Sequence, residues 1–521
     1  MIQRLFCLLP LIVLGGCGGG GESAAAANPT LPAPSAPAAE VSSPFAPAPE
    51  VPAPSAPVSD APSPTAPPAA EPAPVRATVW LSTYDGSKRL AKQEPVEFSA
   101  SATQVPGAFD IDVDETRTYQ TMAGFGASMT DSSAWLIGTR LSTEQRDELM
   151  TKLFDPEQGI GLSQVRHGIG ASDFSLQNYS YSDAPQDNAN ANAPHFSIDY
   201  ERSYFLPVMK QALSINPELR IMGTPWSAPA WMKTQSSLNA GSLRPDMHAS
   251  FAKYLVDYLH AFEQEGVPIE SITIQNEPLH ESQGYPTMRM EAAEQANFIA
   301  NHLGPALMQA GLETRVFLYD HNWDQPEYPM QVLNHAGARQ FATGTAFHCY
   351  GGDVSAQSRV QEMHPDKEIR LTECTGSVGS EFGSDMHWWM RNLFIGGTRH
   401  WASAVLMWNL ALDENSGPQN GGCTSCRGVV TIDQDTGHVT YNGEYYALGH
   451  ASLAARPGAT RIESSRKEGV FDSVAFVNPD GSKGLLVLNE RNEATPITIR
   501  WQELSLQYEL PAQAVVTFRW P

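Results

Sequence analysis

The chain has 521 residues, 41% of them hydrophobic, which is enough material for a large buried core and more than one domain. Its formal net charge of −24 argues against nucleic acid or an anionic membrane surface as a binding partner, because both are negatively charged. The composition therefore favours an acidic globular protein whose partner is not nucleic acid.

The first 17 residues have the pattern of an export signal. Arg4 supplies a positive start, and residues 5–14 form an apolar run that is too short for a spanning helix of about 20 residues. The following Leu-Gly-Gly-Cys resembles a bacterial lipobox, in which Cys17 would be acylated; an ordinary secretory signal cut near Gly21 is the alternative. We expect an exported lipoprotein at the outer membrane, cell surface or periplasm, with a lipid at Cys17 as its membrane contact.

Residues 18–76 consist almost entirely of Ala, Pro, Ser, Val and Gly, with scattered Glu. Such a segment has too little apolar surface to repay the entropy of ordering, so we predict a disordered tether. Ala-Pro repeats favour extended conformations of about 3 Å per residue, which gives a reach on the order of 150 Å. A tether is preferred to an interdomain spacer because no folded domain is predicted before it.

The body of the chain alternates short β-type runs with longer helical stretches, which is typical of βα units around a parallel sheet. Helices are predicted at 250–264, with apolar side chains at helical spacing, and at 291–303. The eight predicted strands are 119–124, 161–169, 219–224, 269–275, 315–319, 344–348, 368–372 and 404–408. Eight such units over residues 119–448 predict an α/β fold, a (β/α)₈ TIM barrel with its active site at the C-terminal strand ends.

The remaining segments on both sides of the barrel are rich in β-type residues. Runs at 471–477, 484–489, 495–501 and 514–518 are separated by turn sequences, and 78–82 and 94–100 also indicate strands. We predict that residues 77–118 and 449–521 together build one all-β sandwich. The alternative is a separate carbohydrate-binding module made from the C-terminus alone, but about 70 residues is small for an independent sandwich.

The six cysteines do not predict a disulfide framework, since Cys7 and Cys17 belong to the signal segment. Cys349 and Cys374 each end a predicted strand. Cys423 and Cys426 form a Cys-Thr-Ser-Cys sequence without two further ligands nearby, so zinc is not expected. A local disulfide between them is favoured over free thiols in an oxidising compartment.

Two glutamates follow predicted strands of the barrel: Glu277 after strand four and Glu373 after strand seven. In a barrel both would face the same mouth. Two carboxyl groups at one site are what cleavage of a glycosidic bond requires, because one protonates the leaving oxygen while the other attacks carbon or activates water. The sequence therefore predicts a glycoside hydrolase.

Short motifs along the whole barrel resemble glycoside hydrolase family 30, the acid-β-glucosidase (glucosylceramidase) family. A single Asn-Glu-Pro would be weak evidence, whereas an ordered set is strong. The matching stretches are Gly-Phe-Gly-Ala-Ser-Met-Thr-Asp at 124–131, Ala-Ser-Asp-Phe-Ser at 171–175, Pro-Trp-Ser-Ala-Pro-Ala-Trp-Met-Lys at 225–233, Asn-Glu-Pro at 276–278, Gly-Tyr-Pro at 284–286, His-Cys-Tyr at 348–350, Thr-Glu-Cys at 372–374 and Trp-Asn-Leu-Ala-Leu at 408–412.

The resemblance implies a retaining mechanism in which Glu277 is the acid/base and Glu373 the nucleophile. Glu277 should have a raised pKa because it must begin protonated, whereas Glu373 must stay ionised. Arg166 and Tyr350 match residues expected to donate hydrogen bonds to Glu373. His348 is either a site hydrogen-bonding partner or a histidine satisfied in the core.

The resemblance also implies sugar contacts. Asn276 is expected to bond the sugar 2-hydroxyl, Asp173, Trp226 and Trp408 match sugar-binding positions, and Tyr285 is a rim residue. The carboxyl groups should lie about 5–5.5 Å apart, and neither a metal nor an organic cofactor is required.

Substrate choice is left open by the sequence. The substrate class is a carbohydrate or glycolipid, with β-glucosides expected and glucosylceramide as the first reading. Two features depart from the animal glucosylceramidase pattern: Met407 stands where that pattern has an acidic residue, and residues 414–431 have no close counterpart there. The segment 414–431 resembles bacterial members and β-1,6-glucanase members of the family. Endo-β-1,6-glucanase, β-xylosidase and β-fucosidase activities are alternatives, and the competing class is a non-catalytic glycan-binding protein at the cell surface.

Overall fold

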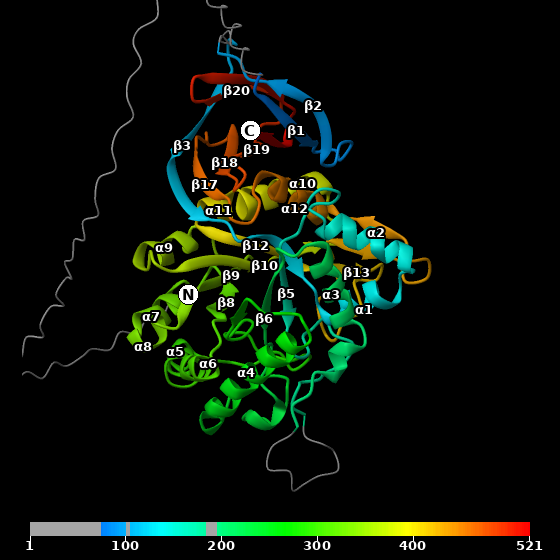
Figure 1. Cartoon of the computed structure of the whole chain (residues 1–521), viewed down its shortest axis with the longest axis vertical. Coiled ribbons are helices and arrows are strands. Elements are labelled where there is room, and N and C mark those ends of the chain that lie inside the picture. The colour runs from blue at the N-terminus through cyan, green and yellow to red at the C-terminus, as the bar shows by residue number, and fades with distance from the viewer. Residues whose placement is uncertain (1–73, 101–104, 184–194) are drawn as a thin grey trace, which may run out of the picture. The chain divides into compact units, whose positions relative to one another are not determined.

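Two β-structures organise the chain, and both are visible in Figure 1. The computed structural model describes residues 74–100, 105–183 and 195–521. The predicted signal, Cys17 and nearly all of the predicted tether lie outside these residues. Among the described residues, no helix combines the length and the apolar character that crossing a membrane requires.

The first β-structure is a closed barrel of eight parallel strands, as predicted. Its buried strands read as apolar runs because helices cover their outer faces. The strands are β4 (Gly124–Ser128), β5 (Gln164–Gly168), β6 (Arg220–Thr224), β7 (Ser271–Thr273), β8 (Arg315–Asn322), β9 (Ala342–His348), β10 (Glu368–Glu373) and β12 (Ala402–Asn409), and β12 pairs with β4 to close the ring.

The first barrel strand differs from the prediction of 119–124. Residues up to Thr121 end the long strand β3 (Phe109–Thr121), where Thr121 pairs with Thr460 in the second β-structure. Gly124 then takes a φ of 127°, a backbone conformation open to glycine but strained for other residues. The chain changes direction there, so one continuous β-type run serves two different sheets.

The helices surround the barrel (Figure 1). In α4 (His248–Gln264) the apolar stripe of the sequence is the buried face, including Phe251, Leu255 and Phe262. The other helices are α1 (Asp131–Thr139), α2 (Thr143–Phe154), α3 (Phe205–Ile215), α5 (Ala292–Phe298), α6 (Gly304–Ala310), α7 (Glu327–Asn334), α8 (Ala336–Arg339), α9 (Ala356–Met363), α10 (Phe382–Trp389), α11 (Gly396–Arg399) and α12 (Gly443–Ala454), with π-helical turns η4 (Ile299–Leu303) and η5 (Met390–Phe394) and short 3₁₀ turns η1 (Asp199–Arg202), η2 (Ala230–Met232) and η3 (Pro245–Met247).

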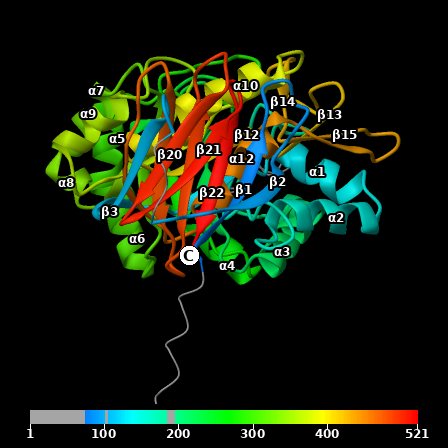
Figure 2. The same cartoon turned by 90° about the horizontal axis from the view of Figure 1, so that it is seen from above.

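The second β-structure confirms the predicted sandwich built from both chain ends (Figures 1 and 2). Its nine strands have the order β2-β1-β22-β19-β18-β17-β3-β20-β21. A backbone bridge between Ser99 and Ser505 joins the two outer margins, so the sheet folds over one apolar core. Besides β3, the strands are β1 (Arg76–Ser82), β2 (Ala91–Glu97), β17 (Thr460–Ser464), β18 (Phe471–Val477), β19 (Lys483–Asn489), β20 (Thr495–Trp501), β21 (Leu504–Leu510) and β22 (Val515–Trp520).

Helix α12 joins the barrel to the sandwich. Its residue His450 is fully buried and bonds the hydroxyl oxygens of Thr517 at 2.9 Å and Ser82 at 2.8 Å, one from each end of the chain. Burial lowers the pKa of His450 to about 3, so this imidazole is neutral. The junction is therefore a packed interior, and the sandwich supports the barrel from one side.

Candidate active site

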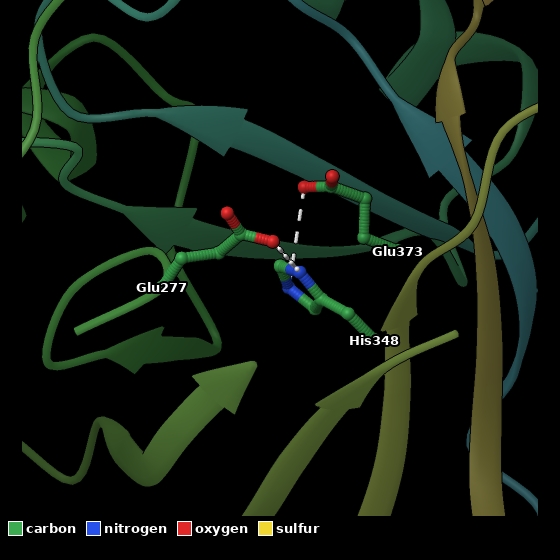
Figure 3. A group of neighbouring side chains, drawn as sticks. All are labelled: Glu277, His348 and Glu373. Carbon is green, nitrogen blue, oxygen red and sulfur yellow. Dashed lines mark hydrogen bonds and ion pairs between the residues drawn. The ribbon is translucent and has the colours of Figure 1, made fainter. Parts of the chain in front are cut away.

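Two carboxyl groups and an imidazole meet at the mouth of the barrel. Glu277 follows β7, His348 ends β9 and Glu373 ends β10. One side-chain oxygen of each glutamate and one ring nitrogen of His348 lie within 4.8 Å of one another. Figure 3 shows the side chains of Glu277 and Glu373 extending toward each other, with the His348 imidazole next to both carboxyl groups. The predicted convergence of Glu277 and Glu373 is thus present in the structure.

Arg166, on β5, organises this group and is fully buried. Its guanidinium donates hydrogen bonds to Glu373 at 2.6 Å, to the Asn276 side-chain oxygen at 2.6 Å and to Asp320 at 3.0 Å. Charge-assisted bonds from a planar guanidinium fix both the position and the charge of their acceptors. Arg166 therefore links the ends of β7, β8 and β10.

Glu373 accepts a hydrogen bond on each of its oxygens. Oε2 accepts from Arg166, and Oε1 accepts from the Tyr350 hydroxyl at 3.0 Å. Both donors were expected from the sequence, and both stabilise the ionised carboxylate. The carboxylate is consequently held in one orientation.

Asp320 is a member of the site that the sequence analysis missed. It is fully buried, accepts from Arg166 and from the hydroxyls of Thr273 at 2.8 Å and Thr372 at 2.6 Å, and lies 3.1 Å from His348 Nε2. The pairing of β8 with β9 shifts register between Tyr319 and His321, and Asp320 has a φ of 61°. This bulge turns the carboxylate into the barrel. The sequence signal that could have identified Asp320 is an acidic residue at the C-terminal end of a barrel strand.

His348 connects the buried carboxylate to the mouth. Its Nε2 faces Asp320, and its Nδ1 lies 3.0 Å from Glu277 Oε1. Burial disfavours the imidazolium, but Glu373, Asp320 and Glu277 outweigh it and raise the pKa of His348 to about 9. The sequence left two interpretations of His348 open, and the structure places this residue in the site.

The five groups carry unequal charge. Arg166 and His348 are cations, whereas Asp320, Glu277 and Glu373 are carboxyl groups, so one proton shared by the two glutamates makes the group neutral. Burial would raise the pKa of Glu277, but hydrogen bonding from His348 and its charge lower it; burial and the neighbouring Glu277 raise the pKa of Glu373. Both shifts run against the sequence-based expectations, which were a raised pKa for Glu277 and an ionised Glu373. The sequence did not reveal that His348 would contact Glu277 or that Glu373 would be buried beside Glu277. The two glutamates titrate as a pair.

The sugar-binding candidates line the same mouth. Trp226 and Trp408 are buried and stacked with ring centroids 5.3 Å apart, and the Arg166 guanidinium lies 4.9 Å from the Trp226 ring. Asp173 has a buried oxygen, Oδ1, without a partner in the described structure, and burial together with Glu373 raises its pKa to about 8. Tyr285 packs against this aromatic cluster, and its hydroxyl lies 2.8 Å from His280 Nε2.

Two disulfides stabilise the loops around the mouth. Cys349 pairs with Cys374, which corrects the expectation that these cysteines form no framework. The cysteines end adjacent parallel strands, which brings their Cα atoms to 5.4 Å, within the range that a disulfide spans. Each lies next to a site residue, Tyr350 or Glu373. Cys423 pairs with Cys426, as favoured, and Cys426 packs beside Trp226 and Trp408.

A carboxylate–imidazole–carboxylate group also has metal-binding donor types. Here both ring nitrogens of His348 face carboxylates, and both oxygens of Glu373 accept protein hydrogen bonds. A guanidinium 2.6 Å from Glu373 further opposes a second cation. The arrangement is suited to acid–base and nucleophilic chemistry by the residues themselves.

Comparisons with known proteins agree with this chemistry. The chain matches the glycosyl hydrolase family 30 TIM-barrel domain over residues 122–453 and the family's β-sandwich domain over residues 458–518. An endo-1,6-β-D-glucanase of Aspergillus fumigatus is 33% identical, over 85% of this chain and 94% of that protein. The lysosomal acid glucosylceramidase of Mus musculus is 27% identical, over 84% and 88%.

A solved endo-β1,6-glucanase has 30% identity and a TM-score of 0.78, and the alignment covers 85% of this chain and 99% of that chain. The family models and this structure share both the barrel and the sandwich. The chain is an O-glycosyl hydrolase and belongs to glycosyl hydrolase family 30.

Proposed function

We propose that this protein hydrolyses β-1,6-glucan by a retaining double displacement, with Glu373 as nucleophile and Glu277 as general acid and base. The observation that carries the proposal is the asymmetry between two neighbouring carboxyl groups. Glu373 receives a hydrogen bond on each oxygen, from Arg166 and Tyr350, whereas Glu277 pairs with the titrating His348. Their side-chain oxygens lie within 4.8 Å, which suits direct attack rather than attack through an intervening water.

In the first step, a Glu373 oxygen attacks the anomeric carbon while the bond from that carbon to the leaving oxygen breaks. The leaving oxygen keeps the bonding electrons and takes the proton of Glu277. In the second step, ionised Glu277 removes a proton from water, and the water oxygen displaces Glu373 from the anomeric carbon. Arg166 and Tyr350 hold Glu373 ready to attack and stabilise it as it leaves.

The shared proton must be on Glu277 when the first step begins. In the free protein the pKa of Glu277 is lowered and that of Glu373 is raised, so the proton has to pass from Glu373 to Glu277 when the substrate binds. The hydrogen bonds from Arg166 and Tyr350, which stabilise ionised Glu373, favour this transfer. Deprotonation of the pair at high pH and protonation of Glu373 at low pH both stop the first step. A bell-shaped dependence of kcat/KM on pH is the expected result.

β-1,6-Glucan is favoured as substrate because the similar proteins named as endo-1,6-β-D-glucanases are 32–33% identical to this chain, against 26–29% for those named as glucosylceramidases. The test is hydrolysis of β-1,6-glucan, glucosylceramide and an aryl β-glucoside by the full chain. We expect oligosaccharides from β-1,6-glucan and at least about tenfold lower kcat/KM on glucosylceramide. A higher kcat/KM on glucosylceramide, the second candidate, than on β-1,6-glucan would refute β-1,6-glucan as the substrate.

We also propose that the enzyme is exported and anchored by a lipid at Cys17, as its N-terminal pattern suggests. A substrate polymer too large to enter a cell agrees with an external location. Replacing Cys17 with Ser should move the protein from the membrane fraction to the soluble fraction. An unmodified Cys17 by mass spectrometry of the wild-type protein would contradict the anchor.

A further inference from the structure

Three asparagines from separate loops form a hydrogen-bonded row at the rim of the barrel mouth. Asn420 Nδ2 donates to Asn178 Oδ1 at 2.5 Å, and Asn178 Nδ2 donates to Asn239 Oδ1 at 3.5 Å. Asn239 Nδ2 in turn donates to the Gln283 carbonyl at 2.9 Å. These residues follow β5, β6 and β12, so all lie on the C-terminal side of the barrel. We call Asn178, Asn239 and Asn420 the amide row.

The amide row is accessible and has hydrogen-bonding capacity left. Asn178 is exposed, and Asn239 and Asn420 are half-buried. Each carboxamide has two N–H donors and a carbonyl oxygen with two lone pairs, and the bonds within the row use only some of them. The row therefore presents neutral donors and acceptors side by side to solvent.

The amide row is linked to the catalytic site by direct contacts. The Asn420 backbone N–H donates to the Asp173 carbonyl at 2.7 Å. The next residue, Gly421, has a φ of 80°, and a Cβ built on it would lie 2.8 Å from the Gly284 carbonyl and 3.5 Å from the Tyr285 ring. Tyr285 packs against Trp226 and Trp408, beside Arg166. A chain of contacts thus leads from Arg166 through the two tryptophans and Tyr285 to the loop of Asn420.

Two of the three loops that carry the row, those of Asn239 and Asn420, are held in place before any ligand binds. Lys233 is buried and donates to Ser227 Oγ at 2.7 Å and to the carbonyls of Leu238 at 2.7 Å and Thr287 at 2.6 Å, next to Asn239. The Cys423–Cys426 disulfide constrains the loop of Asn420. Because side chains on preorganised loops lose little further entropy on binding, such a row binds ligands more tightly than a mobile loop would.

The chemistry of the row selects its ligand. Saccharide hydroxyls donate and accept hydrogen bonds, as carboxamides do, and carry no charge. The alkyl chains of a glycolipid would leave these amides unsatisfied, at a cost for each buried group. We infer that the amide row binds the glucosyl units of a β-1,6-glucan beyond the one at the catalytic carboxyl groups. This inference rests on the proposed function and specifies where the polymer extends.

The test compares a double variant of the row, Asn178→Ala with Asn239→Ala, with the wild-type protein. We expect about a tenfold loss of kcat/KM on β-1,6-glucan, mainly through KM, and less than a twofold change on an aryl β-glucoside, which is too short to reach the row. The matched control is Asn297→Ala with Asn301→Ala, an exposed pair with the same amide–amide bond, at 2.7 Å, on the helical segment after β7. The control should leave both activities unchanged.

The outcomes separate this inference from the proposed function. Unchanged kcat/KM on β-1,6-glucan in the row variant overturns the inference while the proposed substrate stands. Equal losses on the polymer and the aryl glucoside also overturn it, because they indicate a structural role in the catalytic site. A wild-type protein that hydrolyses the aryl glucoside but not β-1,6-glucan refutes the proposed substrate itself, and with it the inference.

Discussion

The mouth and the floor of the barrel both hold buried or half-buried charged groups, but the numbers of positive and negative groups differ. At the floor, Arg315 and Arg370 contact Glu270 and Glu368 at the N-terminal strand ends. Arg370 donates to Glu368 at 2.8 Å and to Glu270 at 3.1 Å, and Arg315 donates to both glutamates. Two cations meet two carboxylates, so the floor is neutral without any shared proton.

At the mouth, Arg166 and His348 face three carboxyl groups. The floor keeps the pKa of Glu270 down, at about 2, because the nearby guanidiniums outweigh its burial. At the mouth, burial and the neighbouring Glu277 raise the pKa of Glu373, so its carboxyl group loses its proton less readily than those at the floor. The comparison teaches that equal numbers of positive and negative groups stabilise the barrel. Where carboxyl groups outnumber the cations, as at the mouth, a carboxyl group can hold a proton for acid–base catalysis. Three predictions test this difference.

The largest effect is expected for Glu373→Gly. Removing the nucleophile should lower kcat on an aryl β-glucoside by on the order of 10⁴-fold or more. Azide should restore part of the rate with an activated substrate and give an α-glycosyl azide, because it enters the face that the carboxylate occupied. The product is identified by NMR. A β-glycosyl azide, as expected for Glu277→Gly, would exchange the two roles.

The next effect separates the two arginines. Arg370→Met leaves the floor glutamates without their buried partner and should lower the free energy of unfolding by about 3–5 kcal/mol, with kcat of the folded protein near wild type. Arg166→Met should lower kcat by about 10²–10³-fold, because Glu373 loses a charged donor. Urea titration and steady-state kinetics measure both. Similar loss of kcat in both variants would refute the distinction between floor and mouth.

The smallest effect concerns pH and His348. A histidine whose pKa rises from 6.5 to about 9 on folding adds stability that is complete below pH 6.5 and lost as pH rises through 9. The excess stability of wild type over His348→Gln should therefore fall by about 1–3 kcal/mol between pH 6 and pH 9.5. His450, which is neutral in the folded protein, is present in both the wild type and the variant, so its contribution cancels in the difference. A difference that is constant with pH would show that His348 is not an imidazolium in the folded site.

Much of the fold was readable from local patterns. The apolar runs that became β5 to β10 and β12 predicted the barrel, because a strand buried on both faces needs continuous apolar residues. Strands β17 and β21 were missed because their sequences are partly polar, and they depend on partners in a sheet whose strands come from both sides of the barrel. The first barrel strand was misplaced because one β-type run is divided between two sheets at Gly124.

The sequence alone determined the barrel, the sandwich and the two glutamates, since periodicity, turn residues and acidic residues at strand ends are local properties. Tertiary structure alone decided the role of Asp320, the contact between His348 and Glu277, the Cys349–Cys374 disulfide and the amide row. Each of these joins residues from different strands through bulges and loop positions that no local pattern specifies. Because a pKa depends on the nearest charges in space, the distribution of the catalytic proton also follows from the folded structure.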